Sequence, residues 1–95
     1  MKTGKWYRED SINPDSGKQE WKYYYVTEEL QDEFLAIDVY KVFWNGKVSR
    51  KHTSQTHESN LDRLTLISKD LALQVLGIED PEDIIADLDR GFKNI

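Results

Sequence analysis

The chain has 95 residues, of which 38% are hydrophobic and 12% aromatic, and its formal net charge is −5. This length predicts one domain, residues 1–95, and this composition is typical of a folded chain with a modest core. The sequence contains no cysteine, which excludes disulfides, thiolate metal sites and cysteine nucleophiles. The negative charge argues against general affinity for nucleic acid.

Short apolar runs separated by polar residues predict four strands in the first half of the chain, the sheet covering residues 4–56. The first two strands, Gly4–Glu9 and Trp21–Thr27, flank a loop at residues 13–18 that is dense in turn-forming residues. The third and fourth strands are Phe34–Trp44 and Lys47–Gln55. We expect the third strand to be central because it is apolar on both faces, and the polar fourth strand to be an edge.

Asn45 and Gly46 predict a two-residue hairpin loop, since both residues tolerate the positive φ of a type I′ turn. Such a loop places Trp44 opposite Lys47, Phe43 opposite Val48, Tyr40 opposite Lys51 and Val39 opposite His52. One face of this hairpin is aliphatic and carries Leu35, Ile37, Val39 and Phe43. We expect that face to receive the helices.

The apolar residues after Ser59 change to helical spacing and predict a helix over residues 60–76, ended by Gly77. Its core stripe consists of Leu61, Leu64, Ile67, Leu71, Ala72 and Val75. Asp80 and Pro81 begin a second helix over residues 80–92, which is rich in acidic residues. The predicted fold class is therefore α+β: a four-stranded, mainly antiparallel sheet (ββββαα) with two C-terminal helices on one face.

The second face of the predicted hairpin combines aromatic and basic side chains. We expect its partner-binding residues to be Trp21, Tyr23, Tyr40, Trp44, Lys47 and Lys51. Tryptophan and tyrosine dominate binding hot spots between proteins. The leading interpretation is therefore a small non-catalytic protein-binding module or inhibitor, of the immunity-protein or phage-regulator type, that binds another protein as a monomer or homodimer. The alternative is a nucleic-acid-binding module that stacks bases on the same face.

Motifs that would indicate an enzyme are missing from the sequence. We find no nucleophile elbow and no glycine-rich phosphate loop, so we expect no catalytic activity and no cofactor. His52 and His57 lie five residues apart, and we interpret them as structural or surface residues and predict no metal site. The first residues form no apolar segment typical of a signal peptide, and no apolar run is long enough to span a bilayer, so we expect a cytoplasmic protein without a membrane partner.

Overall fold

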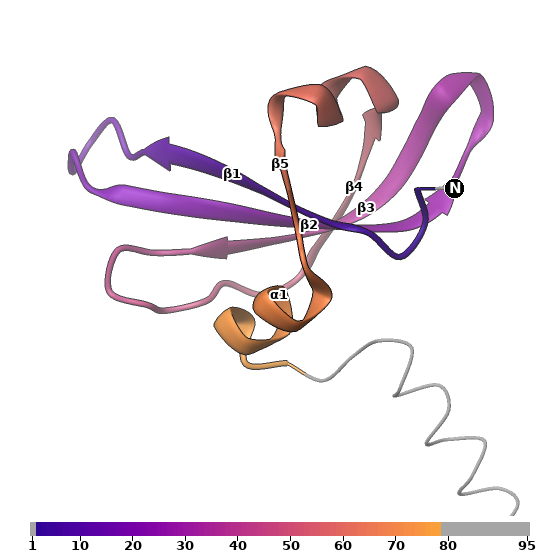
Figure 1. Ribbon diagram of the computed structural model, residues 1–95. Coiled ribbons are helices and arrows are strands. Elements are labelled where there is room, and N and C mark those ends of the chain that lie inside the picture. The colour runs from indigo at the N-terminus through magenta and orange to yellow at the C-terminus, as the bar shows by residue number, and fades with distance from the viewer. Residues whose placement is uncertain (1, 79–95) are drawn as a thin grey trace, which may run out of the picture.

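A computed structural model describes residues 2–78, which form an antiparallel sheet of five strands and one α-helix (Figure 1). The elements are β1 (Trp6–Ile12), β2 (Gln19–Glu29), η1 (Gln31–Glu33), β3 (Phe34–Val42), β4 (His52–His57), η2 (Glu58–Arg63), β5 (Thr65–Ile67) and α1 (Lys69–Leu76). The strand order is β4-β3-β2-β1-β5. The predicted α+β class is confirmed, β4 is an edge as expected, and the predicted number of strands is wrong by one.

The loop between β1 and β2 confirms the first predicted hairpin. The Asn13 amide donates to the Lys18 carbonyl at 2.9 Å, and the Gly17 amide donates to the Asn13 carbonyl at 2.8 Å. The side-chain oxygen of Asn13 also accepts a hydrogen bond from the Asp15 amide at 2.8 Å. One asparagine therefore organises the loop, as expected for a residue whose side chain mimics a backbone turn.

The tight turn that follows β3 has three residues, 44–46, so the predicted two-residue loop is wrong. The Phe43 amide donates to the Lys47 carbonyl at 2.8 Å, and the Gly46 amide donates to the Phe43 carbonyl at 2.9 Å. Phe43 therefore lies opposite Lys47, and Trp44 does not. Gly46 has a φ of +86°, whereas Asn45 instead uses its side-chain oxygen to accept from the Lys47 amide at 3.1 Å. This pattern fits a type I turn followed by a bulge at glycine.

A second irregularity restores the predicted register further along the hairpin. Val48 bridges Val42 rather than Phe43, and the Ser49 amide donates to the Lys41 carbonyl at 2.8 Å. Val39 nevertheless pairs with His52 as predicted. Two residues, at positions 50 and 51, therefore oppose the single residue at position 40, which is the definition of a β-bulge.

The predicted helix over residues 60–76 is divided into η2, β5 and α1. The exposed edge of β1 takes β5 as a partner, with Trp6 opposite Ile67 and Arg8 opposite Thr65. The β-branched side chains of Thr65 and Ile67 favour this extended backbone. The Ser68 hydroxyl then accepts from the Leu71 amide at 3.2 Å and begins α1. Gly77 ends α1 with a φ of 65°, as predicted. The predicted second helix, 80–92, lies outside the described residues.

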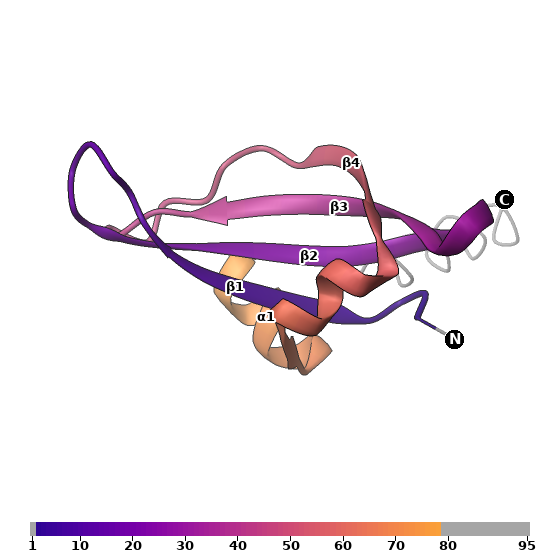
Figure 2. The same cartoon turned by 90° about the horizontal axis from the view of Figure 1, so that it is seen from above.

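Two clusters of buried residues lie on opposite sides of the sheet, and we name each face by what lies on it. On the helix face, α1 packs against the aromatic cluster of Trp6, Tyr23, Tyr25, Tyr40 and Val42. On the groove face, Leu61 of η2 packs against Tyr7, Val26, Leu35 and Ile37. Figures 1 and 2 show α1 and η2 on opposite sides of the strands. The prediction that the helices cover the aliphatic face is therefore wrong for α1.

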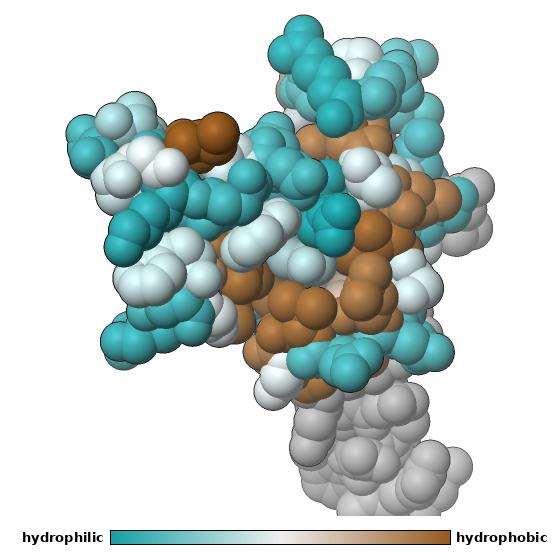
Figure 3. All heavy atoms as spheres, turned by 60° about the vertical axis from the view of Figure 1, so that its left-hand side comes forward, coloured by the Kyte–Doolittle hydropathy of each residue, from teal (hydrophilic) through white to brown (hydrophobic). Residues whose placement is uncertain are grey.

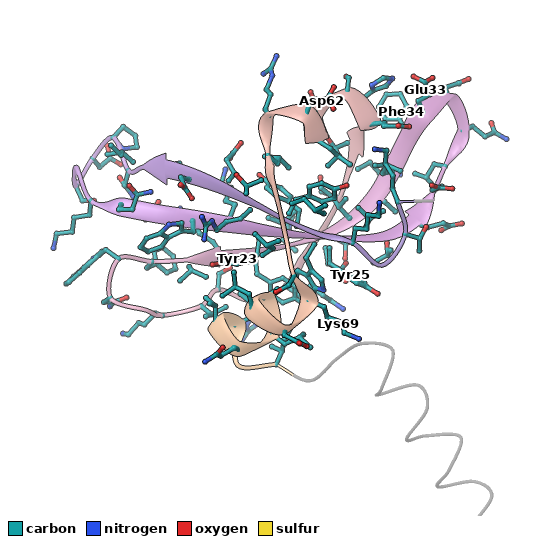
Figure 4. All side chains as sticks on the ribbon, viewed as in Figure 1. Tyr23, Tyr25, Glu33, Phe34, Asp62 and Lys69 are labelled. Carbon is teal, nitrogen blue, oxygen red and sulfur yellow. The ribbon has the colours of Figure 1, made fainter. Side chains whose placement is uncertain are left out.

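Aromatic side chains explain why α1 packs where it does, because each buries about 150–250 Å² and β1, β2 and β3 supply several of them to the helix face. Figure 4 shows Tyr23 and Tyr25 on the side of the sheet toward α1. Within α1, Ala72 and Leu76 are buried at 0% and 5% exposure, whereas Leu71 is 40% exposed. The predicted core stripe through Leu71 is therefore rotated from the observed one.

Candidate interaction surfaces

The six residues of the predicted aromatic and basic face do not form one exposed surface in the structure. Tyr23 and Tyr40 are only 3% and 8% exposed and lie in the cluster beneath α1. Trp21 is partly buried and packs against the same cluster. Burial and the nearby Asp38 carboxylate raise the pKa of the Tyr40 hydroxyl. These three aromatic residues therefore stabilise the core, and the expectation that Tyr23 and Tyr40 are exposed anchors is wrong.

The remaining three predicted residues are exposed. Trp44 is 56% exposed, and Lys47 and Lys51 are also exposed. The Lys18 ammonium lies 3.6 Å from the centroid of the Trp44 ring, which is a cation–π contact between the β1–β2 and β3–β4 loops. Figures 1 and 2 show both loops at the same end of the sheet. We call this surface, formed by Ile12, Lys18, Trp44 and Lys47, the loop end.

Exposed large apolar side chains lie in three areas of the described residues: the loop end, the start of β3, where Phe34 is 43% exposed, and the surface of β5 and α1. Ile12 is 66% exposed at the loop end, whereas Leu66 is 59% exposed on β5 and Leu71 is 40% exposed on α1. Figure 3 shows apolar side chains gathered over β5 and α1, with a mostly polar surface toward the loop end. Trp44 and Ile12 are thus the exposed apolar side chains of a mostly polar loop end.

The groove face contains a hollow that was not predicted from the sequence. Its volume is about 470 Å³, and residues of β2, β3 and β4 line it. The basic side chains among them are Lys22, Lys41 and His52, and the aromatic one is Tyr24. A second hollow of about 220 Å³ shares Tyr24 and Thr56 with the first and reaches η2. We call the two adjoining hollows the groove. The predicted helices were expected to cover this face, but η2 covers only one end of it.

A buried carboxylate lies on the groove face near the loop end. Glu20 is 5% exposed. Its carboxylate oxygens lie 3.2 Å from the Lys41 ammonium and 3.2 Å from the Asn13 side-chain amide that donates to it. The hydrogen bond from Asn13 and the charge of Lys41 lower the pKa of this carboxyl group below its ordinary value of 4.5. Lys41 is therefore largely neutralised, whereas Lys22 forms no ion pair within residues 2–78.

Tyr24 occupies the middle of the groove, where its hydroxyl donates to the Glu9 carboxylate at 3.3 Å. Burial and the negative charge of Glu9 raise the pKa of Tyr24 to about 12. The phenol therefore remains neutral near neutral pH, and it can present a hydrogen-bonding group beside an aromatic ring.

The two histidines have different environments. The His57 Nδ1 atom accepts from the Ser59 amide at 3.1 Å and thereby caps η2. Figure 4 shows the neighbouring residues Glu33 and Phe34 at the end of the sheet near η2. His52 lines the groove instead. Within residues 2–78, no group of three or more potential ligands is arranged to hold a metal ion, and no helix there is long and apolar enough to cross a membrane.

No protein-family model, curated protein or solved structure matches this chain. The chemistry and the exposure of the surfaces described above are therefore the basis for inferring what the chain binds.

Proposed function

We propose that this chain is a small non-catalytic protein-binding module that captures its partner through the loop end. The observation that supports this is the exposure of Trp44, which is 56% of its surface. Tryptophan is among the residues most enriched in hot spots, where burial of its large ring on binding supplies much of the affinity. An inhibitory role, in which capture blocks the activity of the partner, is the specific form of this proposal.

Main-chain hydrogen bonds constrain the loop that carries Trp44. The hydrogen bonds between Phe43 and Lys47 and between Gly46 and Phe43 close the loop on both sides of the tryptophan. Lys18 packs against the ring from the neighbouring loop. A preorganised anchor loses little conformational entropy on binding, which favours affinity. Lys47 lies at the rim, where a charge mainly changes the association rate.

The test compares three forms of the protein in affinity capture from the source cell, followed by binding measurements with the purified partner. Trp44→Ala should reduce the affinity for that partner by at least about tenfold. Phe34→Ala is the matched control, because Phe34 is an exposed aromatic residue at the other end of β3. Equal loss with both variants, or no partner that depends on Trp44, would contradict the proposal.

The nucleic-acid alternative loses one of its stacking residues because Tyr40 is buried. The net charge of −5 further weakens the attraction to phosphates, which supplies most nonspecific affinity. Sub-micromolar binding to single-stranded RNA or DNA at about 0.15 M salt, lost when Lys47 and Lys51 are both reversed in charge, would favour this alternative instead.

A further inference from the structure

We propose that the outer edge of β4 binds an extended acidic peptide segment as a sixth strand, with acidic side chains directed along the groove. This inference rests on the protein-binding function proposed above and specifies the chemistry of a partner. The sheet order places β4 at one edge, so its main chain bonds to β3 on one side only. Addition of a strand to such an edge is a recurring way of binding peptides.

The ladder identifies which residues of β4 have main-chain groups pointing outward. The hydrogen bond from Ser49 to Lys41 shows that the main chain of Lys41 points toward the β4 side. Every second residue of an antiparallel strand points the same way. His52, Ser54 and Thr56 pair with Val39, Ile37 and Leu35 and therefore bond to β3. The amides and carbonyls of Thr53, Gln55 and His57 then point away from the sheet.

This edge has little of the protection that proteins place on exposed strands. Lysine and proline are residues that commonly prevent strand addition, together with bulges, and β4 contains neither of these residue types. The bulge at residues 50 and 51 precedes β4 and leaves its six residues regular. The opposite edge, β5, has only three residues and is followed directly by α1. β4 is therefore the longer open edge of the described sheet.

Charge selects an acidic partner for this edge. Residues 46–57 contain Lys47, Arg50 and Lys51 and no acidic residue, which gives a net charge of +3. Lys51 lies 3.9 Å from the Asp38 carboxylate, whereas Arg50 is exposed and forms no ion pair with any other residue between 2 and 78. Carboxylates on an added strand would lie near Arg50 and extend toward His52, which lines the groove.

A second copy of this chain is a poorer occupant of the same edge. Residues 46–57 contain no acidic residue, so a second β4 strand would offer no carboxylate to Arg50 and Lys51. An acidic peptide meets the same main-chain groups and adds the attraction of opposite charges. The geometry of the edge and its charge therefore favour a partner of opposite charge.

The test uses fluorescence anisotropy with a labelled ten-residue peptide in which glutamate alternates with threonine, at about 0.15 M salt. Alternation places all the glutamates on one face of the added strand. The comparison probes are the same peptide with alternate N-methylated amides, the peptide with lysine in place of glutamate, and a ten-nucleotide thymidine oligonucleotide. We expect the acidic peptide to bind at least about tenfold more tightly than each of these.

Two variants at one position isolate the main-chain contribution. Gln55→Pro removes an outward amide without removing a bond to β3, a site where an edge strand tolerates proline, and should weaken peptide binding by at least about tenfold. Gln55→Ala keeps the amide and should bind like the unchanged protein. Arg50→Glu should also weaken binding, and more so at low salt. The NMR spectrum of the backbone amides verifies that each variant is folded.

Hydrogen exchange gives a readout that does not depend on a substitution. In the free protein the amides of Thr53 and Gln55 should exchange faster than those of Ser54 and Thr56, and the peptide should slow the exchange of the first pair. Equal affinity for the N-methylated peptide, tighter binding of the oligonucleotide, or no binding of the acidic peptide would each overturn the proposal. None of these outcomes changes the dependence of partner capture on Trp44, so the two proposals fail separately.

Discussion

The helix face of the sheet is closed by α1, whereas the groove face is closed by η2 at one end only. On the helix face, large aromatic side chains from three strands meet Ala72 and Leu76. On the groove face, Leu61 covers a smaller and mainly aliphatic cluster, and the rest of the surface is hollowed and lined by both polar and apolar side chains. One face therefore buries the larger aromatic side chains of this small domain, whereas the other keeps an open hollow.

The largest expected effect contrasts two tryptophans. Trp6 is 1% exposed at the centre of the helix face, so Trp6→Ala should destabilise the protein by about 3–5 kcal/mol. Trp44→Ala removes only a cation–π contact at the surface and should cost less than about 1 kcal/mol. Denaturant unfolding measures both values. Similar costs would show that the loop end contributes to the core.

The second comparison lies within α1. Leu76 is 5% exposed and Leu71 is 40% exposed, so Leu76→Ala should cost about 2–5 kcal/mol and Leu71→Ala about 1 kcal/mol or less. This order differs from the stripe expected from the sequence, in which Leu71 was central. The midpoints of urea unfolding, at a constant m-value, measure the two costs in unfolding free energy. A larger cost for Leu71→Ala than for Leu76→Ala would mean that another face of α1 is covered.

The groove face provides the third comparison. Leu61 is the buried residue that η2 contributes, at 4% exposure. Leu61→Ala should cost about 2–3 kcal/mol, toward the lower end for leucine, because the adjoining groove lets the site relax. Leu66→Ala serves as the control, since Leu66 is 59% exposed. A cost above that of Leu76→Ala would reverse the ranking of the two faces.

A smaller effect is expected from acid, which should weaken the contribution of Glu20 on the groove face to stability. The pKa of Glu20 is lowered in the folded protein, so its contribution to stability is present above the unfolded pKa and is lost as the pH falls through the folded value. The difference in stability between the unchanged protein and Glu20→Gln should therefore shrink below pH 4.5. Thermal melting across this pH range measures it, and a difference independent of pH would contradict the lowered pKa.

Much of the sheet could be predicted because its signals are local. The turn residues around Asn13 and Gly46 identified both hairpins, and the register between Val39 and His52 was correct even though the loop has one more residue than predicted. The bulge at residues 50 and 51 offsets the extra residue in the turn and so restores the register. It could not be predicted, because a bulge depends on contacts between strands rather than on local sequence.

Two features required long-range information. The leucines after Asn60 have helical spacing, but pairing of Thr65–Ile67 with β1 outweighs it, since the edge of β1 is satisfied only in the folded sheet. The exposure of Tyr23 and Tyr40 could not be predicted either, because it depends on which face α1 covers. The loop-end candidate Trp44 was predicted correctly as exposed because turn tips lie at the surface.

The turn between β2 and β3 contains backbone strain whose removal could raise the stability of the protein. Asp32 and Glu33 have φ values of 58° and 64°, a left-handed backbone that costs a non-glycine residue roughly 1–2 kcal/mol. Glu33→Gly would release part of that strain, raising stability by about 0.5–1 kcal/mol after the entropy cost of glycine, as thermal melting would show. A chain with such strain can accept a costly substitution elsewhere and recover the lost stability at this turn. An unchanged melting temperature would mean that the turn relaxes at no cost.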